Sequence, residues 1–217
     1  MRLARLPLIA LTSLLALGLT SCATSQIYAG NKKAGTYFVL PKEWHLISNK
    51  LLNQKEAEST APGAGDKLSR VQFQEAYSTE LGVTPADVFS LTTPKGAVAY
   101  IRVRALSNAE LNSVSYNSLR DIVVPISRWA TGTDKSAPVF SISDDYEIVD
   151  KGGRGVHTIY DFTGGDHISQ TVNQSAMVSN DHRMLYVLLI RASTKFYSAH
   201  QKELSKIADS LTVRGAN

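Results

Sequence analysis

The histidine and aspartate residues between positions 157 and 182 are the side chains of this sequence best suited to metal-ion or acid–base chemistry. They are His157, Asp161, Asp166, His167, Asp181 and His182. Imidazole nitrogens and carboxylate oxygens are common ligands of transition metals. A two-residue turn at positions 164–165 would put His157 and Asp161 on one face of a hairpin and His167 on the other. His157 and Asp161 would then be about 13 Å apart along their strand, too far to share one ion. The spacing favours solvated surface residues, and leaves open whether His157, Asp161 or His167 binds any metal.

The sequence motifs of the common enzyme classes are absent. There is no GxSxG or SxxK serine motif, no HExxH zinc motif and no phosphate-binding GxxxxGK[ST] loop. The adjacent Asp144 and Asp145 are expected in a turn and not as a catalytic dyad, because neighbouring residues of a strand point apart. We therefore expect a protein that is not an enzyme, with no catalytic residues, no cofactor and no resident metal.

The single cysteine, Cys22, stands where a bacterial lipoprotein would carry its lipid. It follows Leu19, Thr20 and Ser21, which together with it are similar to a lipobox. Before them lie a short basic region and a 13-residue apolar stretch, too short to span a bilayer. We predict that residues 1–21 are a signal peptide and that the Cys22 thiol receives diacylglycerol, so that Cys22 is the site of a lipid modification that includes palmitate. Residues 22–34 would then be a lipid-anchored tether.

This assignment sets the compartment and the redox chemistry. The protein would be extracytoplasmic and anchored to a bacterial membrane, with the outer membrane possible where the cell has one. Once Cys22 is acylated no thiol remains, so disulfides and thiolate metal sites are excluded.

Composition is that of one ordinary globular domain. The chain has 217 residues, of which 43% are hydrophobic and 19% charged. The signal segment holds two of the 23 basic residues, so the rest of the chain has 21 basic and 19 acidic residues and a net charge of +2. The basic residues are scattered, and we expect no nucleic-acid partner.

Hydrophobic alternation and turn residues predict many short strands and two helices. The expected strands are Thr36–Leu40, Trp44–Leu52, Val71–Tyr77, Asp87–Thr92, Ala97–Ala105, Val139–Ile142, Tyr146–Val149, Val156–Phe162, His167–Ser175 and Met184–Ala192. The first helix is expected after a capping box formed by Ser107 and Glu110 and extends to Pro125; the second spans 198–209. The polar stretch 53–69 is expected to be a flexible loop. Met184–Ala192, the most apolar run, is predicted to be the central strand.

The order of these elements resembles the PsbP-like superfamily. Gly35–Trp44 (GTYFVLPKEW) is similar to that family's opening strand, Gly152–Phe162 to its hairpin, Arg183–Leu188 to its apolar strand and Lys206–Val213 to its ending. Leu211 departs from the pattern, since the family usually has phenylalanine there. The resemblance implies a single domain over residues 35–213, with an α/β (α+β) fold in which an α/β/α sandwich surrounds a mainly antiparallel sheet. It also implies a binding or assembly protein.

These observations lead to one main functional hypothesis and two alternatives. The main hypothesis is a lipid-anchored cell-envelope protein whose PsbP-like domain binds or assembles partner proteins without catalysing a reaction. The first alternative is a lipoprotein that binds a small ligand or a cell-wall glycan in an aromatic groove. The tyrosines that could line such a groove are Tyr37, Tyr77, Tyr100, Tyr146, Tyr160, Tyr186 and Tyr197. An unrecognised hydrolase is the second alternative.

Overall fold

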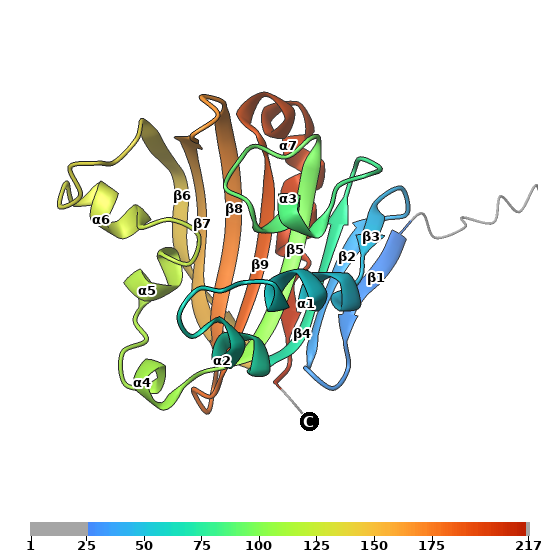
Figure 1. Cartoon of the computed structure of the whole chain (residues 1–217), viewed down its shortest axis with the longest axis vertical. Coiled ribbons are helices and arrows are strands. Elements are labelled where there is room, and N and C mark those ends of the chain that lie inside the picture. Colours follow the sequence, from blue (N-terminus) through green and yellow to red (C-terminus); the bar gives the residue numbers. More distant parts are fainter. Residues whose placement is uncertain (1–25, 216–217) are drawn as a thin grey trace, which may run out of the picture.

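The most apolar run of the sequence lies in the middle of a seven-stranded antiparallel sheet. The computed structural model describes residues 26–215. The strands of this sheet are β3 (His45–Ile47), β4 (Val71–Ser78), β5 (Ala97–Ala105), β6 (Phe140–Asp150), β7 (Gly153–Thr163), β8 (Ser169–Ser179) and β9 (Met184–Ser193). They lie in the order β3-β4-β5-β9-β8-β7-β6 (Figure 1). The prediction of a central strand at Met184–Ala192 is confirmed.

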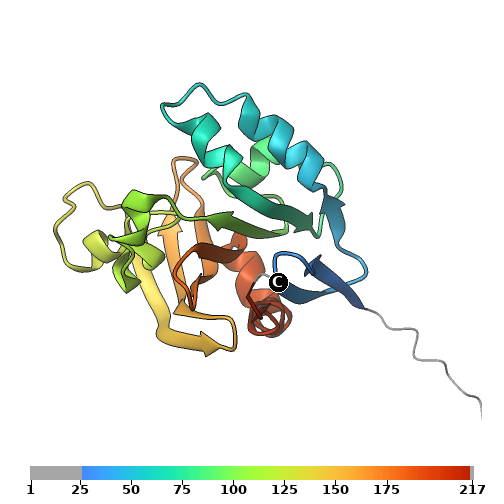
Figure 2. The same cartoon turned by 90° about the horizontal axis from the view of Figure 1, so that it is seen from below.

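Helices cover both faces of this sheet, which confirms the α/β/α sandwich. The helices on one face are α1 (Asn49–Ala57), α2 (Ala64–Ser69), α3 (Pro85–Phe89), α4 (Asn108–Leu111), α5 (Tyr116–Arg120) and α6 (Ile126–Ala130). The long helix α7 (Thr194–Asp209) covers the other face. Figure 2 shows the sheet between α1 and α2 on one side and α7 on the other. No helix within residues 26–215 has the length and apolar character needed to cross a bilayer.

The main core lies between the sheet and α7. Tyr186, Leu188 and Ile190 of β9 are buried there against Tyr197 and Leu204 of α7. The alternate residues of β9 point to the opposite face, toward the six short helices. A strand covered on both faces is apolar along its whole length, which is why this run stood out in the sequence.

A second, three-stranded sheet lies beside α7. It consists of β1 (Gln26–Asn31), β2 (Thr36–Pro41) and β10 (Thr212–Val213), with β2 in the middle. Gly30 in β1 has a φ of 143°, and a Cβ there would lie 2.3 Å from the carbonyl oxygen of Thr36. The expectation of a tether over 22–34 is therefore wrong from residue 26 onward, because this segment pairs with β2. Cys22 and the predicted signal peptide, 1–21, lie outside the described residues.

Three expectations of local structure are also corrected. The predicted loop at 53–69 contains the end of α1 and all of α2, with Leu52 fully buried to hold α1 on the sheet. The strand expected at 87–92 is occupied by α3, whose first turn is capped by Thr84. The capping box of Ser107 and Glu110 is confirmed, but the helix that it begins ends at Leu111 and two further short helices follow.

Candidate binding groove

An open groove of about 530 Å³ crosses the sheet face that carries the six short helices. Leu185, Val187 and Leu189 of β9 line it as an apolar floor. Helices α1 to α3 border it on one side and α4 and α5 on the other (Figure 1). Phe89 and Leu91 lie on its rim and are 37% and 49% exposed. The groove therefore offers a buried apolar surface next to exposed apolar side chains.

A polar cluster on β5 connects the floor of the groove to α1. The guanidinium of Arg102 donates to Glu56 of α1 at 2.7 Å and to the Tyr100 hydroxyl at 3.3 Å. The Tyr100 hydroxyl in turn donates to the buried side chain of Gln74 at 2.6 Å. Burial raises the pKa of Tyr100 to about 12, so this hydroxyl stays protonated as a donor. The Nε atom of Arg102 is buried and has no hydrogen-bond partner among the described residues.

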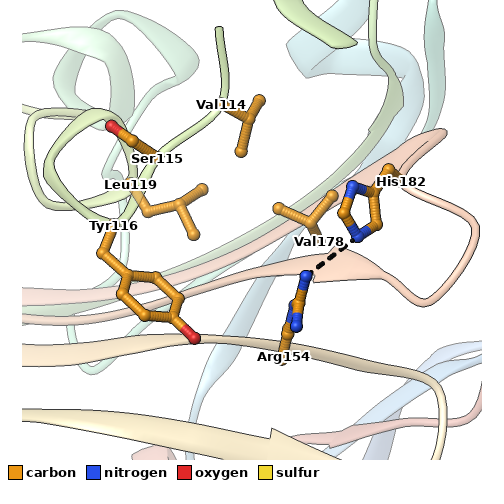
Figure 3. Close-up of a pocket in the computed structure, with 7 residues that line it drawn as sticks. All are labelled: Val114, Ser115, Tyr116, Leu119, Arg154, Val178 and His182. Carbon is orange, nitrogen blue, oxygen red and sulfur yellow. Dashed lines mark hydrogen bonds between the residues drawn. The ribbon is translucent and has the colours of Figure 1, made fainter. Parts of the chain in front are cut away.

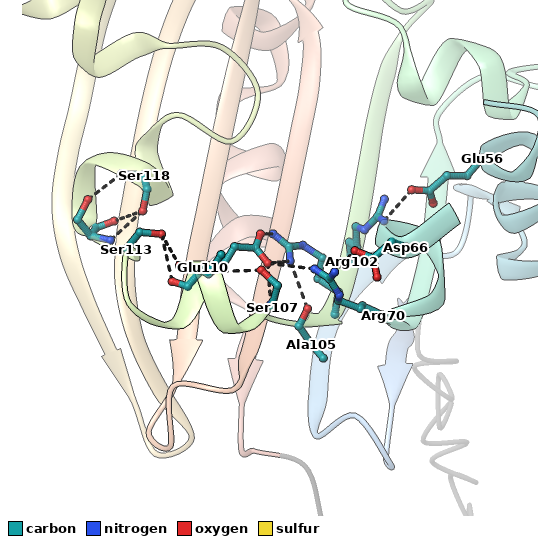
Figure 4. A network of polar contacts seen from close by, with 12 residues as sticks. Glu56, Asp66, Arg70, Arg102, Ala105, Ser107, Glu110, Ser113 and Ser118 are labelled. Carbon is teal, nitrogen blue, oxygen red and sulfur yellow. Dashed lines mark hydrogen bonds and ion pairs between the residues drawn. The ribbon is translucent and has the colours of Figure 1, made fainter. Parts of the chain in front are cut away.

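A second ion pair fixes the start of α4. Arg104 of β5 donates to both carboxylate oxygens of Glu110, at 2.6 and 3.0 Å, in a two-pronged contact. The same carboxylate caps α4 by accepting from the Ser107 backbone amide at 2.8 Å. Hydrogen bonds from Arg104, followed by those from Ser107, lower the pKa of Glu110 to about 2. Figure 4 shows how the polar groups of Glu110, Ser107 and Arg70 gather beside the strands.

Arg191 of β9 attaches α3 to the sheet. Its side chain is 4% exposed and donates to the carbonyl oxygens of Ser90 at 2.5 Å and of Asp87 and Val88 at 3.1 Å. These carbonyls end α3 and carry the negative end of its dipole. Burial lowers the pKa of Arg191, and no carboxylate of the described residues forms an ion pair with it. Sequence reasoning missed this residue, although a lone arginine in the most apolar run was a signal.

The residues first considered for metal chemistry do not converge. His157 is buried, shares a hydrogen bond with Ser175 at 2.9 Å and stacks on Tyr146 at 4.8 Å, so the expectation of a solvated histidine is wrong. Burial lowers its pKa. Asp161 accepts from Thr171 at 2.5 Å. Residues 26–215 contain no group of three or more histidine, cysteine or acidic side chains placed to hold a metal ion.

The hairpin between β7 and β8 differs from the expected two-residue turn. Thr163 pairs with Ser169, so the connection contains five residues, 164–168, and His167 lies in it with a φ of 60°. A carboxylate oxygen of Asp166 accepts from the Thr93 amide at 2.7 Å and holds the longer loop. The acidic pair at 144–145 is likewise not in a turn, because it belongs to the continuous strand β6 next to a β-bulge.

The tyrosines do not form an aromatic groove. Of the seven considered, Tyr100 alone lines the groove. Tyr186 and Tyr197 belong to the core against α7, and Tyr160 to a cluster beneath α6. Their distribution follows the usual packing of tyrosine in strands.

A smaller hollow of about 320 Å³ lies beside α5 (Figure 3). There Arg154 of β7 lies 3.2 Å from Nε2 of His182, which sits in the turn between β8 and β9 with a φ of 59°. Since arginine can only donate, this nitrogen is the acceptor of the hydrogen bond. Leu119 and Val178 line the apolar part of the hollow. The contact connects the turn to the neighbouring strand.

The comparisons with known proteins give similarity in structure but none in sequence family. No protein-family model and no curated protein sequence matches the chain. The solution structure of cyanobacterial PsbP (CyanoP) from Synechocystis sp. PCC 6803 aligns with a TM-score of 0.50 and 11% identity, over 90% of this chain and 98% of that one. LpqN, involved in cell envelope biogenesis of Mycobacterium tuberculosis, gives a TM-score of 0.46 and 12% identity over 87% and 90%. The Saccharomyces cerevisiae Ran-binding protein Mog1p gives 0.43 and 8% over 88% and 96%. The described chain therefore forms a domain with the PsbP-like fold, as its sequence resemblance predicted.

Proposed function

We propose that this chain is a non-enzymatic, lipid-anchored binding protein of the bacterial cell envelope, and that its groove receives a segment of a partner protein. The observation that carries the proposal is the position of Phe89 and Leu91, which are exposed on the rim of a groove with an apolar floor. Exposed apolar side chains that adjoin such a surface are typical of protein interaction sites. The envelope location rests on the motif that ends at Cys22.

The state of the groove's ionisable side chains supports binding over catalysis. A general base works best when its pKa is close to the working pH. The pKa of Glu110 is about 2, and its oxygens are occupied by Arg104. Glu56 is similarly held by Arg102. The Glu110 carboxylate is therefore poorly suited to accept a proton at neutral pH, and both carboxylates help to shape the groove.

The position of Arg191 supports a second candidate function, in which the groove binds a small anionic ligand. It lines the groove, and backbone carbonyls are the acceptors of its hydrogen bonds. A volume of about 530 Å³ would also admit a small molecule. A carboxylate or phosphate bound at this end would lie close to a guanidinium that has no acidic partner among the described residues.

Site-specific photo-crosslinking in intact cells distinguishes these candidates. A photoreactive amino acid replaces Leu91 on the groove rim in one strain and Tyr28, an exposed residue of β1, in a matched control. We expect a discrete protein adduct from position 91 that position 28 does not give. A small mass increase at position 91 without a protein adduct would favour the small ligand. Identical adducts from both positions, or none from position 91, would contradict a role for the groove.

A further inference from the structure

The outer strand β6 is a long, unpaired edge of the main sheet. It contains 11 residues and pairs with β7 on one side only. Within the described chain no hydrogen bond reaches the outward-facing backbone groups of 142–149. The opposite edge of the same sheet, β3, has only three residues. An open row of backbone donors and acceptors is a template on which another strand can pair.

Apolar side chains of β6 are exposed to solvent along this edge. Val149 is 83% exposed, Tyr146 42% and Ile142 40%. Tyr146 lies on the α7 side of the sheet, where it stacks on His157. Val149 and Ile142 belong to the other face. An added strand could therefore bury apolar side chains on both faces, which would stabilise it beyond its backbone hydrogen bonds.

The charge of β6 determines which kind of strand could pair with its free edge. Its charged residues are Asp144, Asp145, Glu147 and Asp150, and it has no lysine or arginine. Asp145 is occupied by Arg120 and Thr158, and Asp150 by the backbone amides of Lys151 and Val213. Asp144 and Glu147 have no ion-pair or hydrogen-bond partner among the described residues.

A second copy of this chain is a poor occupant of the edge. An antiparallel β6–β6 pair centred on Tyr146 would place Asp145 opposite Glu147 twice. A pair centred between Asp145 and Tyr146 would place Asp144 opposite Glu147. Like charges directly opposite one another destabilise a strand pair. The acidic edge therefore opposes self-association and favours a basic strand.

We propose that β6 pairs with an extended basic segment of a partner protein, with two cationic side chains three positions apart, opposite Asp144 and Glu147, and β-branched residues between them. Strand addition of this kind takes affinity from backbone hydrogen bonds and specificity from alternating side chains. The edge of β6 is separate from the strand that forms the groove floor. The proposal for β6 therefore does not depend on whether the groove binds a partner.

A designed peptide tests the proposal on the full chain, purified as the cell produces it. The fluorescent probe has two lysines three positions apart, with valine and threonine around them, and both of its ends are blocked. We expect saturable binding by anisotropy, together with slower hydrogen exchange confined to β6. Asp144→Asn with Glu147→Gln should weaken binding on the order of fivefold. The matched pair Glu43→Gln with Glu80→Gln, which removes equal charge from exposed positions, should leave it unchanged.

Peptide controls separate strand addition from simple charge attraction. Two versions of the peptide carry N-methyl groups on one or the other strand edge, and only the version with a free bonding edge should bind. Equal binding by both versions, or by a peptide with glutamate in place of lysine, would overturn the proposal. It would also be overturned by absence of binding, by protection outside β6, or by a dimer of the chain that already protects β6.

Discussion

Replacement of Arg191 by methionine is expected to destabilise the protein and to loosen one side of the groove. The methionine keeps most of the buried aliphatic stem but removes three hydrogen bonds to the carbonyls of Asp87, Val88 and Ser90. Helix α3 contains only five residues, so it depends on such external contacts and cannot be stable by itself. Phe89 ends this helix and would lose its fixed position on the groove rim.

The expected change in the free energy of unfolding follows from two opposing effects of the Arg191→Met substitution. A hydrogen bond from a charged group contributes about 1.5–3 kcal/mol to stability. The loss of three such bonds therefore removes a large amount of stabilising free energy before any compensation. Removal of a buried guanidinium also relieves its desolvation, which offsets part of that loss. We expect a net decrease of about 3 kcal/mol in the free energy of unfolding of Arg191→Met. Arg191→Lys keeps the charge but not the planar fork, and should lose about 1–2 kcal/mol.

Urea denaturation and hydrogen exchange together check this expectation. Denaturation gives the free energy of unfolding, and exchange should show faster opening of α3 (Pro85–Phe89) than of β9. A loss below about 0.5 kcal/mol, the range of ordinary surface changes, would refute the anchoring role. Equal exchange rates of α3 in Arg191→Met and wild type would refute the link between Arg191 and the groove rim.

Four further outcomes are expected. Leu188→Ala, at a site 1% exposed, should lower the free energy of unfolding by about 2–5 kcal/mol in urea melts, whereas Val149→Ala on the exposed edge should change it by less than about 0.5 kcal/mol. Because the folded state lowers the pKa of Glu110 from 4.5 to about 2, its contribution is present above pH 4.5 and is lost as the pH falls toward 2. The stability difference between wild type and Glu110→Gln, on the order of 1 kcal/mol after solvent screening, should therefore vanish in that interval, and a pH-independent difference would contradict the ion pair. Cys22→Ala should yield a soluble or unprocessed chain, and a mature-sized form that still fractionates with membranes would disprove the anchor. Limited proteolysis should cut first within 58–63, the exposed connection between α1 and α2, and protection of this connection with earlier cleavage elsewhere would contradict the expectation.

Strands that are buried on one or both faces could be predicted from the sequence, because burial imposes an apolar pattern on them. Ala97–Ala105 forms β5 with these bounds, and Met184–Ala192 differs from β9 by one residue. Helix α1 was missed because Leu52 is its only buried residue, so it shows no apolar stripe. The register of the β7–β8 hairpin was wrong because two adjacent glycines suggested a short turn, while Asp166 holds a longer one through Thr93.

The groove was less predictable than the sheet for a physical reason. Its ion pairs join residues that are far apart in sequence, such as Arg102 with Glu56. The acceptors of Arg191 are backbone carbonyls, which leave no trace in residue type. A periodic pattern records burial against a sheet, but it does not record which helix end a buried guanidinium will meet.

The groove is bordered by segments whose local structure was wrongly predicted from the sequence: α1 begins and α3 lies where strands were expected, and α2 lies where a loop was expected. The short helices lie in the segments 49–69, 85–89 and 108–130, where side-chain caps begin α3 and α4 and arginines of β5 contact α1 and α4. The chain shares its fold with cyanobacterial PsbP at 11% identity, and a shared fold does not determine what is bound. Under the proposed function, we expect binding specificity to depend on how Arg102, Arg104 and Arg191 position the short helices beside β9. Substitutions at those three arginines should change binding in the groove while the strands remain paired.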